Sequence, residues 1–244
     1  MSHFELTYKP FGERSILVEW PSKIDKSILL DVLRFKEILQ KVYIKEKVYI
    51  KYAYNSLLVV YGSTINNIYD RILDLKTYYS AEVGLRKPAF RQWRIPVCYD
   101  DSFGIDLDEL VNEFQLSKSE IIELHCKSNY IVFFIGFLPG FLYLGGLDEK
   151  LHFPRKKKPR LKVPKGAVAI GGKQTGIYPN ESPGGWNIVG NSPINFFDLN
   201  KKVPCFAQSG DKINFYPISK QKYDDIKTLV DAGVYQIESE VIDG

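Results

Sequence analysis

The sequence predicts an α+β protein in which a small N-terminal α/β-layer domain precedes an all-β sandwich or barrel. Residues 1–88 alternate strand-sized runs with helical periodicity, whereas beyond residue 130 short strand-sized runs are separated by Pro and Gly. Aromatic residues make up 14% of the 244 residues, which favours strands. Two basic residues before Pro88 mark the boundary, so we expect domains at 1–88 and 89–244.

The N-terminal elements follow from the spacing of apolar residues. Two segments, 22–41 and 63–80, repeat apolar residues at helical spacing, and Ser22 with Asp25 is expected to cap the first helix. Strands are expected at residues 15–20, 48–52 and 56–61.

The second part is expected to begin with a strand and two short helices and then to become rich in strands. Ser117 and Glu120 have the spacing of a capping box. Helices are expected at residues 106–114, 117–127 and 221–229. Strands are expected at residues 93–99, 130–137, 168–170, 187–189, 194–199 and 212–218.

Composition excludes several classes of protein. The net charge of +4 is too small to indicate nucleic-acid binding, and the three Cys and three His lack the spacing of a disulfide framework or a metal site. The uncharged run 131–147 contains Pro139 and four Gly, which predicts a buried strand and a loop rather than a membrane span. The N-terminus lacks the apolar run of a signal peptide, so we expect a cytoplasmic protein.

Three segments between residues 136 and 193 have the composition of binding loops. Residues 155–165 hold seven basic residues in eleven, which indicates either a solvated loop or an anion site stiffened by two prolines. The GGKQTG segment at 171–176 does not match the phosphate-loop pattern, because Ala167 and Gln174 stand where it requires a glycine and a Ser or Thr. The segment is therefore expected to be either a tight turn or a loop whose backbone N–H groups contact an anion. Residues 177–186 form a Pro- and Gly-rich loop without a nearby His for a hydrolase triad.

These segments together resemble one protein family. The runs 137–147, 172–179 and 182–186, with the Pro-Arg pairs at 154–155 and 159–160, closely resemble the B-subunit family of bacterial ATP-dependent 5-oxoprolinase. This family is also called allophanate hydrolase subunit 1 or the KipI kinase-inhibitor family, and it forms one half of the carboxyltransferase domain of urea carboxylase. The resemblance extends over nearly the whole chain, but Ser102 and Ile105 replace a carboxylate and a proline that relatives usually show.

The resemblance implies a C-terminal cyclophilin-like β-barrel and a role as one part of a complex. With partner proteins, the C and A subunits, such a protein opens 5-oxo-L-proline to L-glutamate while ATP, with Mg, is hydrolysed by the assembled complex rather than by this chain alone. Two alternatives stay open on the same motifs. One is a KipI-like inhibitor of a sensor histidine kinase, and the other is a carboxyltransferase or allophanate-hydrolase-type component of urea metabolism.

The reaction that this resemblance implies needs cationic side chains that bind phosphate oxygens and hydrogen-bond donors that bind the amide oxygen of the substrate. The candidate catalytic residues are His125, Gln174, Thr175 and Tyr178. The candidate substrate- or anion-binding residues are Arg155, Arg160, Lys165, Lys173, Ser182, Trp186, Pro139 and Tyr143. We expect loops 137–143, 155–165 and 173–186 to line a cleft of the barrel. The alternatives are a structural His125 and loops that only pack on one another.

Overall fold

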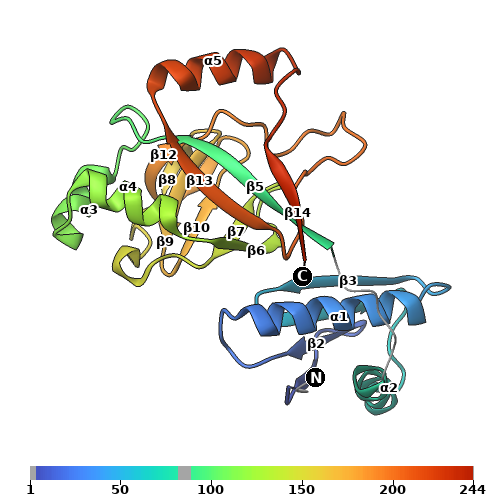
Figure 1. The fold of residues 1–244 in the computed structure, drawn as a ribbon. Helices are drawn as coiled ribbons and strands as arrows, with labels where there is room; N and C mark the ends of the chain where they lie inside the picture. Colours follow the sequence, from blue (N-terminus) through green and yellow to red (C-terminus); the bar gives the residue numbers. More distant parts are fainter. Residues whose placement is uncertain (1–3, 82–88, 244) are drawn as a thin grey trace. The chain divides into compact units, whose positions relative to one another are not determined.

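The computed structural model describes residues 4–81 and 89–243 (Figure 1). The chain divides into two compact units, Met1–Lys87 and Pro88–Gly244, each with its own hydrophobic core. The first unit is a small sheet with helices and the second contains a closed β-barrel, so the predicted α+β class is confirmed.

The N-terminal unit is an antiparallel sheet packed against two helices. Its strands run in the order β1-β2-β4-β3. Alternate residues such as Ile16, Val18, Leu57 and Val59 are fully buried and form one core with the apolar stripe of α1, the helix that crosses the sheet in Figure 1. The elements are β1 (Thr7–Pro10), β2 (Ser15–Glu19), α1 (Lys26–Val42), β3 (Val48–Ala53), β4 (Ser56–Tyr61) and α2 (Ile68–Ser80).

Both helices of this unit begin later than the apolar spacing predicts. α1 starts after Asp25, whose carboxylate accepts the Ser27 N–H at 2.7 Å, so Ser22 lies outside the helix. α2 starts after Asn67, whose side chain accepts from Tyr69 and Asp70, and residues 63–67 form a loop instead of a first turn. In each case a capping side chain, rather than the first apolar residue, fixes the start.

The C-terminal unit is built on one sheet whose order is β12-β9-β10-β7-β6-β13-β5-β14. An additional pairing of Asn191 in β12 with Cys98 in β5 closes this sheet into a barrel, and β14 lies outside the ring beside β5. Its strands are β5 (Ala89–Cys98), β6 (Tyr130–Ile135), β7 (Leu142–Gly145), β9 (Ala167–Gly171), β10 (Gln174–Ile177), β12 (Asn187–Asn191), β13 (Lys212–Ile218) and β14 (Ser239–Asp243).

Inward-facing residues fill the barrel, and short helices cover it. Val168, Ile170, Leu142, Leu144 and Ile213 are fully buried in one core. The capping box of Ser117 and Glu120 is present at the start of α4, as predicted. The remaining elements are α3 (Leu107–Phe114), α4 (Lys118–Lys127), a 3₁₀ turn (Glu149–Leu151), α5 (Lys220–Asp231), and β8 (Arg160–Val163) paired with β11 (Ser182–Gly184).

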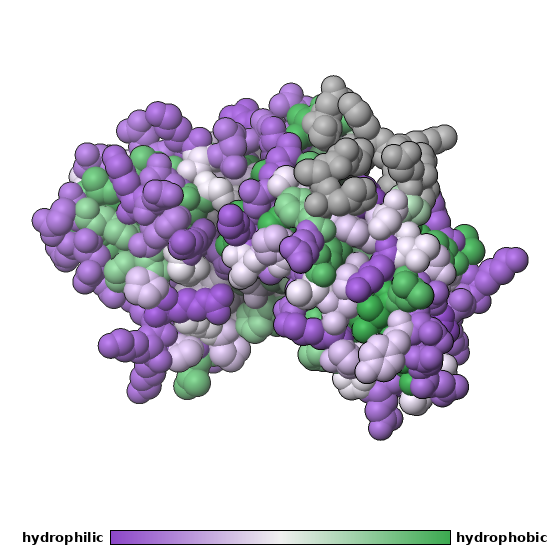
Figure 2. All heavy atoms as spheres, turned by 90° about the horizontal axis from the view of Figure 1, so that it is seen from below, coloured by the Kyte–Doolittle hydropathy of each residue, from purple (hydrophilic) through white to green (hydrophobic). Residues whose placement is uncertain are grey.

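Residues 194–199 differ from the expected elements, whereas the run 131–147 contains the expected strand and loop. Residues 194–199 form no strand, although Ile194 and Phe196 are buried, because this segment packs into the core without entering the sheet. The run 131–147 forms β6, a loop and β7, and no helix in the described part of the chain has the length and apolar character to cross a membrane. Hydrophilic and hydrophobic residues are interspersed over the face shown in Figure 2.

Candidate functional site

Five aromatic rings gather on the outer face of the barrel. Side chains alternate between the two faces of β7 and β10. The core residues of these strands face into the barrel, so Tyr143 and Gly176, which pair with each other, face outward. Other rings reach the same face from the 136–141 loop, from β6 and from the loops beside β11. We call Phe134, Phe141, Tyr143, Tyr178 and Trp186 the aromatic cluster.

The rings of the aromatic cluster are in direct contact. Phe134 stacks on Tyr143 with centroids 4.2 Å apart and planes at 11°. Phe141 meets the Tyr178 ring edge-on at 5.1 Å and the Trp186 ring at 5.6 Å. Trp186 also lies 5.9 Å from Tyr143. Loops 137–143 and 177–186 therefore meet here, and the centre of their meeting point is filled by side chains, since Phe141, Tyr178 and Trp186 are buried.

Two glycines make room for Trp186. A Cβ added at Gly171 would approach the indole ring to 2.5 Å, and one added at Gly176 would approach it to 2.9 Å. From the basic loop, the Arg155 guanidinium lies 5.3 Å from the centroid of the Trp186 ring, at the distance of a cation–π contact. The Lys156 N–H donates to the Gly185 carbonyl at 2.7 Å, which ties the basic loop to the loop that carries Trp186.

Gln174 stands at the edge of the aromatic cluster with an unused acceptor. It pairs across the hairpin with Gly171, the residue that Trp186 covers, so its side chain lies on the same outer face. Its Oε1 is buried and has no hydrogen-bond partner among residues 4–81 and 89–243. Because a buried, unpaired acceptor costs about 1–3 kcal/mol, this amide is a natural point for a ligand to donate a hydrogen bond.

The GGKQTG segment is a hairpin turn rather than a phosphate-binding loop. Gly172 and Lys173 connect β9 to β10, and Gly172 has the positive φ of 70° that a two-residue turn with Gly first requires. The Gly172 N–H donates to the Phe153 carbonyl at 2.6 Å, and the Gly172 carbonyl accepts from Phe153. The Gly172 N–H is therefore used within the fold and does not face an anion. Lys173 is exposed at the tip.

His125 and Thr175 lie inside the barrel unit and away from its surface. Both side chains are completely buried. Thr175 Oγ1 donates to the Ala169 carbonyl at 3.1 Å, so it accepts from Nε2–H of His125 at 3.0 Å, and Nδ1 accepts the Tyr99 hydroxyl at 2.8 Å. Burial lowers the pKa of His125 from 6.5 to about 3. This geometry favours the structural alternative for His125 and gives Thr175 the same role.

Two of the basic-loop cations are neutralised by one buried carboxylate. Arg160 binds Asp106 through both of its terminal nitrogens, at 3.0 and 2.5 Å, and Lys156 Nζ lies 3.0 Å from the same carboxylate. Asp106 is 3% exposed and also accepts the Ile188 N–H. Arg160 therefore anchors the basic loop to the start of α3, whereas Arg155 remains exposed beside Trp186.

The other candidates are distributed around the aromatic cluster or outside it. Tyr178 is buried, which raises its pKa, and a hydrogen bond with the Trp186 backbone opposes that rise. Ser182 is buried, and its hydroxyl donates to the Pro183 carbonyl at 3.2 Å. Pro139 and Lys165 are exposed. The structure therefore joins Tyr143, Tyr178, Trp186, Arg155 and Gln174, and it does not bring Lys165, Lys173 or His125 into that group.

Sequence reasoning missed Phe134 and the anchoring role of Asp106. Phe134 lies in a strand that reads as wholly buried, and only the bulge between Val132 and Phe134 turns its ring outward to stack on Tyr143. Asp106 lies 54 residues from Arg160 in the sequence. Of the two unusual positions, Ser102 donates to Asp100 at 2.6 Å and Ile105 is half exposed, both in the turn before α3. Within the described residues no three His, Cys, Asp or Glu lie together as a metal site would need.

The family described as carboxyltransferase domain, subdomain C and D, matches residues 6–207. The chain belongs to this family. It is 43% identical over 129 residues to the B subunit of 5-oxoprolinase from Bacillus subtilis, a match that covers 53% of this chain and 54% of the relative. It is 39% identical over 163 residues to the same-named protein of Escherichia coli O157:H7, covering 67% of this chain and 74% of the relative. The predicted resemblance to the 5-oxoprolinase B-subunit family is confirmed.

A solved structure shares the fold. The crystal structure of Kluyveromyces lactis urea carboxylase superposes with a TM-score of 0.82 over 98% of this chain and 24% of that chain, at 21% identity. This likeness concerns the fold. The match to the Bacillus relative spans only about half of that protein's length.

Proposed function

We propose that this chain is the B subunit of an ATP-dependent 5-oxoprolinase complex, which hydrolyses 5-oxo-L-proline to L-glutamate in the cytoplasm together with the C and A subunits. Three relatives that are named as B subunits of 5-oxoprolinase are 39% to 46% identical to it over their matched segments. The structural observation that carries the proposal is the unpartnered Oε1 of Gln174 at the edge of the aromatic cluster, together with the exposed Arg155 guanidinium over the Trp186 ring.

The ligand 5-oxoproline has the groups that this arrangement can bind. Its lactam N–H is a donor for Gln174 Oε1, its carboxylate is a partner for the Arg155 guanidinium, and its ring can pack on the half-buried Tyr143 and Phe134. The proposed chemistry is phosphoryl transfer to the lactam oxygen followed by attack of water. In this reaction the chain orients the lactam and holds its carboxylate.

ATP, with Mg, is proposed to be held by the assembled complex. The glycine-rich turn at 171–176 uses its Gly172 N–H for the Phe153 carbonyl. Of the basic loop, Lys156 and Arg160 are engaged by Asp106. We therefore expect the isolated chain to form no glutamate from 5-oxoproline and ATP.

The decisive experiment is co-purification of the chain with its candidate C and A subunits, followed by an assay of glutamate formed from 5-oxoproline and ATP. Replacing Gln174 by Ala should reduce kcat/KM at least tenfold, equivalent to about 1.4 kcal/mol, while the complex still assembles. Gln221, an exposed glutamine on α5, provides the matched control, and Gln221→Ala should leave the rate unchanged. Full activity of the Gln174→Ala complex would contradict the assigned site, and turnover by the isolated chain would contradict the requirement for partners.

The same preparation tests the alternatives. A component of urea metabolism is the second candidate, because the urea amidolyase of Saccharomyces cerevisiae is 29% identical over 147 residues. That role predicts no glutamate formation but carboxyl transfer to urea in the presence of a biotin carboxylase. The kinase-inhibitor alternative predicts stoichiometric binding to a sensor histidine kinase, with no turnover in either assay.

A further inference from the structure

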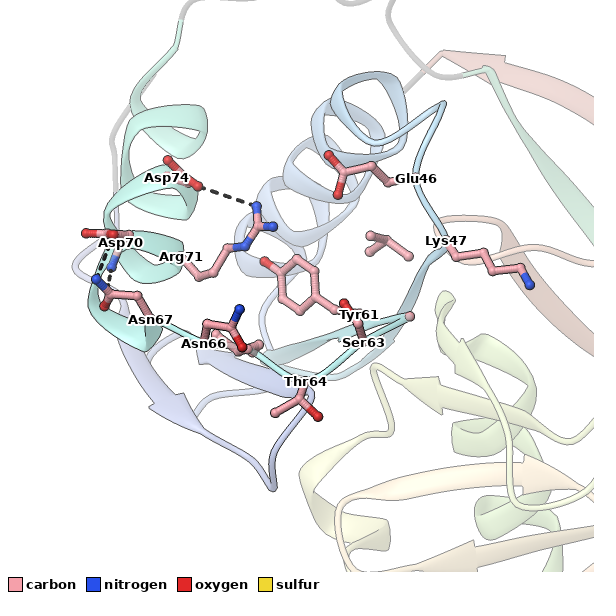
Figure 3. Close-up of a pocket in the computed structure, with 13 residues that line it drawn as sticks. Glu46, Lys47, Tyr61, Ser63, Thr64, Asn66, Asn67, Asp70, Arg71 and Asp74 are labelled. Atoms are coloured by element: carbon pink, nitrogen blue, oxygen red, sulfur yellow. Dashed lines mark hydrogen bonds and ion pairs between the residues drawn. The ribbon is translucent and has the colours of Figure 1, made fainter.

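A second polar pocket lies wholly within the N-terminal unit (Figure 3). It has a volume of about 580 Å³ and is enclosed by three segments that are distant in sequence. One wall is the connection 46–48 between α1 and β3, the floor is the loop 61–67 that follows β4, and the other wall is the first two turns of α2. None of the residues assigned above to the barrel site belongs to it.

Groups of opposite charge face each other across this pocket. From α2, the Arg71 guanidinium lies over the Tyr61 ring at 5.2 Å and is 3.7 Å from Asp74, at the long end of an ion pair. From the opposite wall, the Glu46 carboxylate forms no ion pair within the described part of the chain. Figure 3 shows Glu46, Tyr61 and Arg71 directed into one space and Lys47 directed away from it. Each charge therefore has capacity for a further partner.

The floor supplies neutral polar groups on exposed side chains. The side chains of Ser63, Thr64 and Asn66 line the pocket and have no hydrogen-bond partner among residues 4–81 and 89–243. The floor and the 46–48 wall lie close together at Gly62, where an added Cβ would lie 2.9 Å from Lys47 Cβ and 3.0 Å from its carbonyl oxygen. A residue larger than glycine would force this floor and the 46–48 wall apart.

We propose that this pocket binds a small zwitterion of the α-amino-acid class. The carboxylate would pair with Arg71, whose fork suits a bidentate contact, and the ammonium would pair with Glu46, with the hydroxyls and the amide of the floor completing the contacts. A polyanion such as a nucleotide is disfavoured, because three carboxylates, Glu46, Asp70 and Asp74, line the pocket against two cations. A simple cation is disfavoured by Arg71. This inference is independent of the reaction proposed for the barrel.

Calorimetric titration of the full chain with L-alanine and with L-glutamate tests the proposal. At least one of these amino acids should bind saturably in the millimolar range, and acetate and methylammonium, which each carry one half of the zwitterion, should bind at least tenfold more weakly. Arg71→Gln and Glu46→Gln should each weaken the amino-acid affinity at least tenfold. The matched control pair is Arg94 and Glu238, an ion pair of 2.9 Å on the barrel unit, where the same replacements should leave the affinity unchanged.

Three outcomes would overturn the proposal. They are no saturable binding of either amino acid, acetate binding as tightly as the amino acids, or unchanged affinity in both pocket variants. A circular-dichroism melt of each variant shows whether the N-terminal unit has stayed folded. If Arg71→Gln unfolds it, Asn66→Ala, which alters only the floor, provides the second test and should also weaken binding.

Discussion

The imidazole of His125 should make the barrel unit sensitive to mild acid. Its side chain is completely buried and neutral, with Nε2–H donated to Thr175 and Nδ1 accepting from Tyr99. Burial lowers its pKa from 6.5 to about 3. Below pH 6.5 the unfolded chain therefore binds a proton that the folded chain does not bind until the pH approaches 3.

The sign and size of the effect follow from this difference in proton binding. The contribution of His125 to stability is fully present above pH 6.5 and is lost as the pH falls from 6.5 toward 3. Each pH unit inside that window costs about 1.4 kcal/mol, so a change from pH 7 to pH 5 should remove about 2 kcal/mol of unfolding free energy. Other titrating groups add their own terms, so the effect has to be measured as a difference between two proteins.

The assay compares urea denaturation of the protein with that of His125→Gln at pH 7 and at pH 5. Gln keeps an N–H for Thr175 but cannot be protonated in this range. A Trp20→Phe background restricts the fluorescence signal to Trp93 and Trp186, which both belong to the barrel unit. The loss of stability from pH 7 to pH 5 should be about 2 kcal/mol larger for the protein with His125. Equal losses in the two proteins would refute the reasoning.

Two further predictions concern packing around the barrel. Gly176→Ala should destabilise the barrel by about 1–3 kcal/mol, because the new methyl group would lie 2.9 Å from Trp186. The control Gly185→Ala, whose new methyl group has its nearest neighbouring atom at 3.4 Å, should cost less than about 1 kcal/mol. The urea unfolding midpoints of the two variants test this difference. Asp106→Asn should cost about 3–5 kcal/mol of stability, because Lys156 and Arg160 would lose their buried carboxylate partner. The control Asp101→Asn, which removes an exposed ion pair with Lys118, should cost less than about 1 kcal/mol. Equal shifts of the urea midpoint in the two variants would contradict the anchoring role of Asp106.

The fold class and most elements could be predicted because their signals are local. The helices α1 and α4 have both an apolar stripe and a capping side chain, and β13 alternates over seven residues. The short strands β7 and β10 were missed because each has four residues that include Gly and gains its hydrogen bonds from neighbours distant in sequence. The segment 194–199 has the composition of a strand, but it enters no sheet, and Ile194 and Phe196 are buried in the barrel core instead.

The sequence predicts which residue types form the site but not which of them contact one another. Trp186 and Tyr143 stand out as large aromatics in Gly- and Pro-rich segments, so they were found. The bulge that turns Phe134 outward leaves no local signal. The dense charge of residues 155–165 suggests an anion site, yet Arg160 is used for Asp106, and only the fold reveals that pairing.

Two energetic costs lie on the same outer face of the barrel, and neither contributes to folding. Gln174 keeps a buried acceptor without a partner in the described part of the chain, which costs about 1–3 kcal/mol. Phe137 has a φ of 61°, a left-handed backbone that a bulky residue rarely adopts, and its ring is 62% exposed while it contacts Phe141 of the aromatic cluster. A sequence selected for stability alone would remove both costs with an apolar residue at 174 and a glycine at 137. We infer that a functional constraint acts on this face, because a ligand that donates to Gln174 would satisfy the acceptor that folding leaves unpaired.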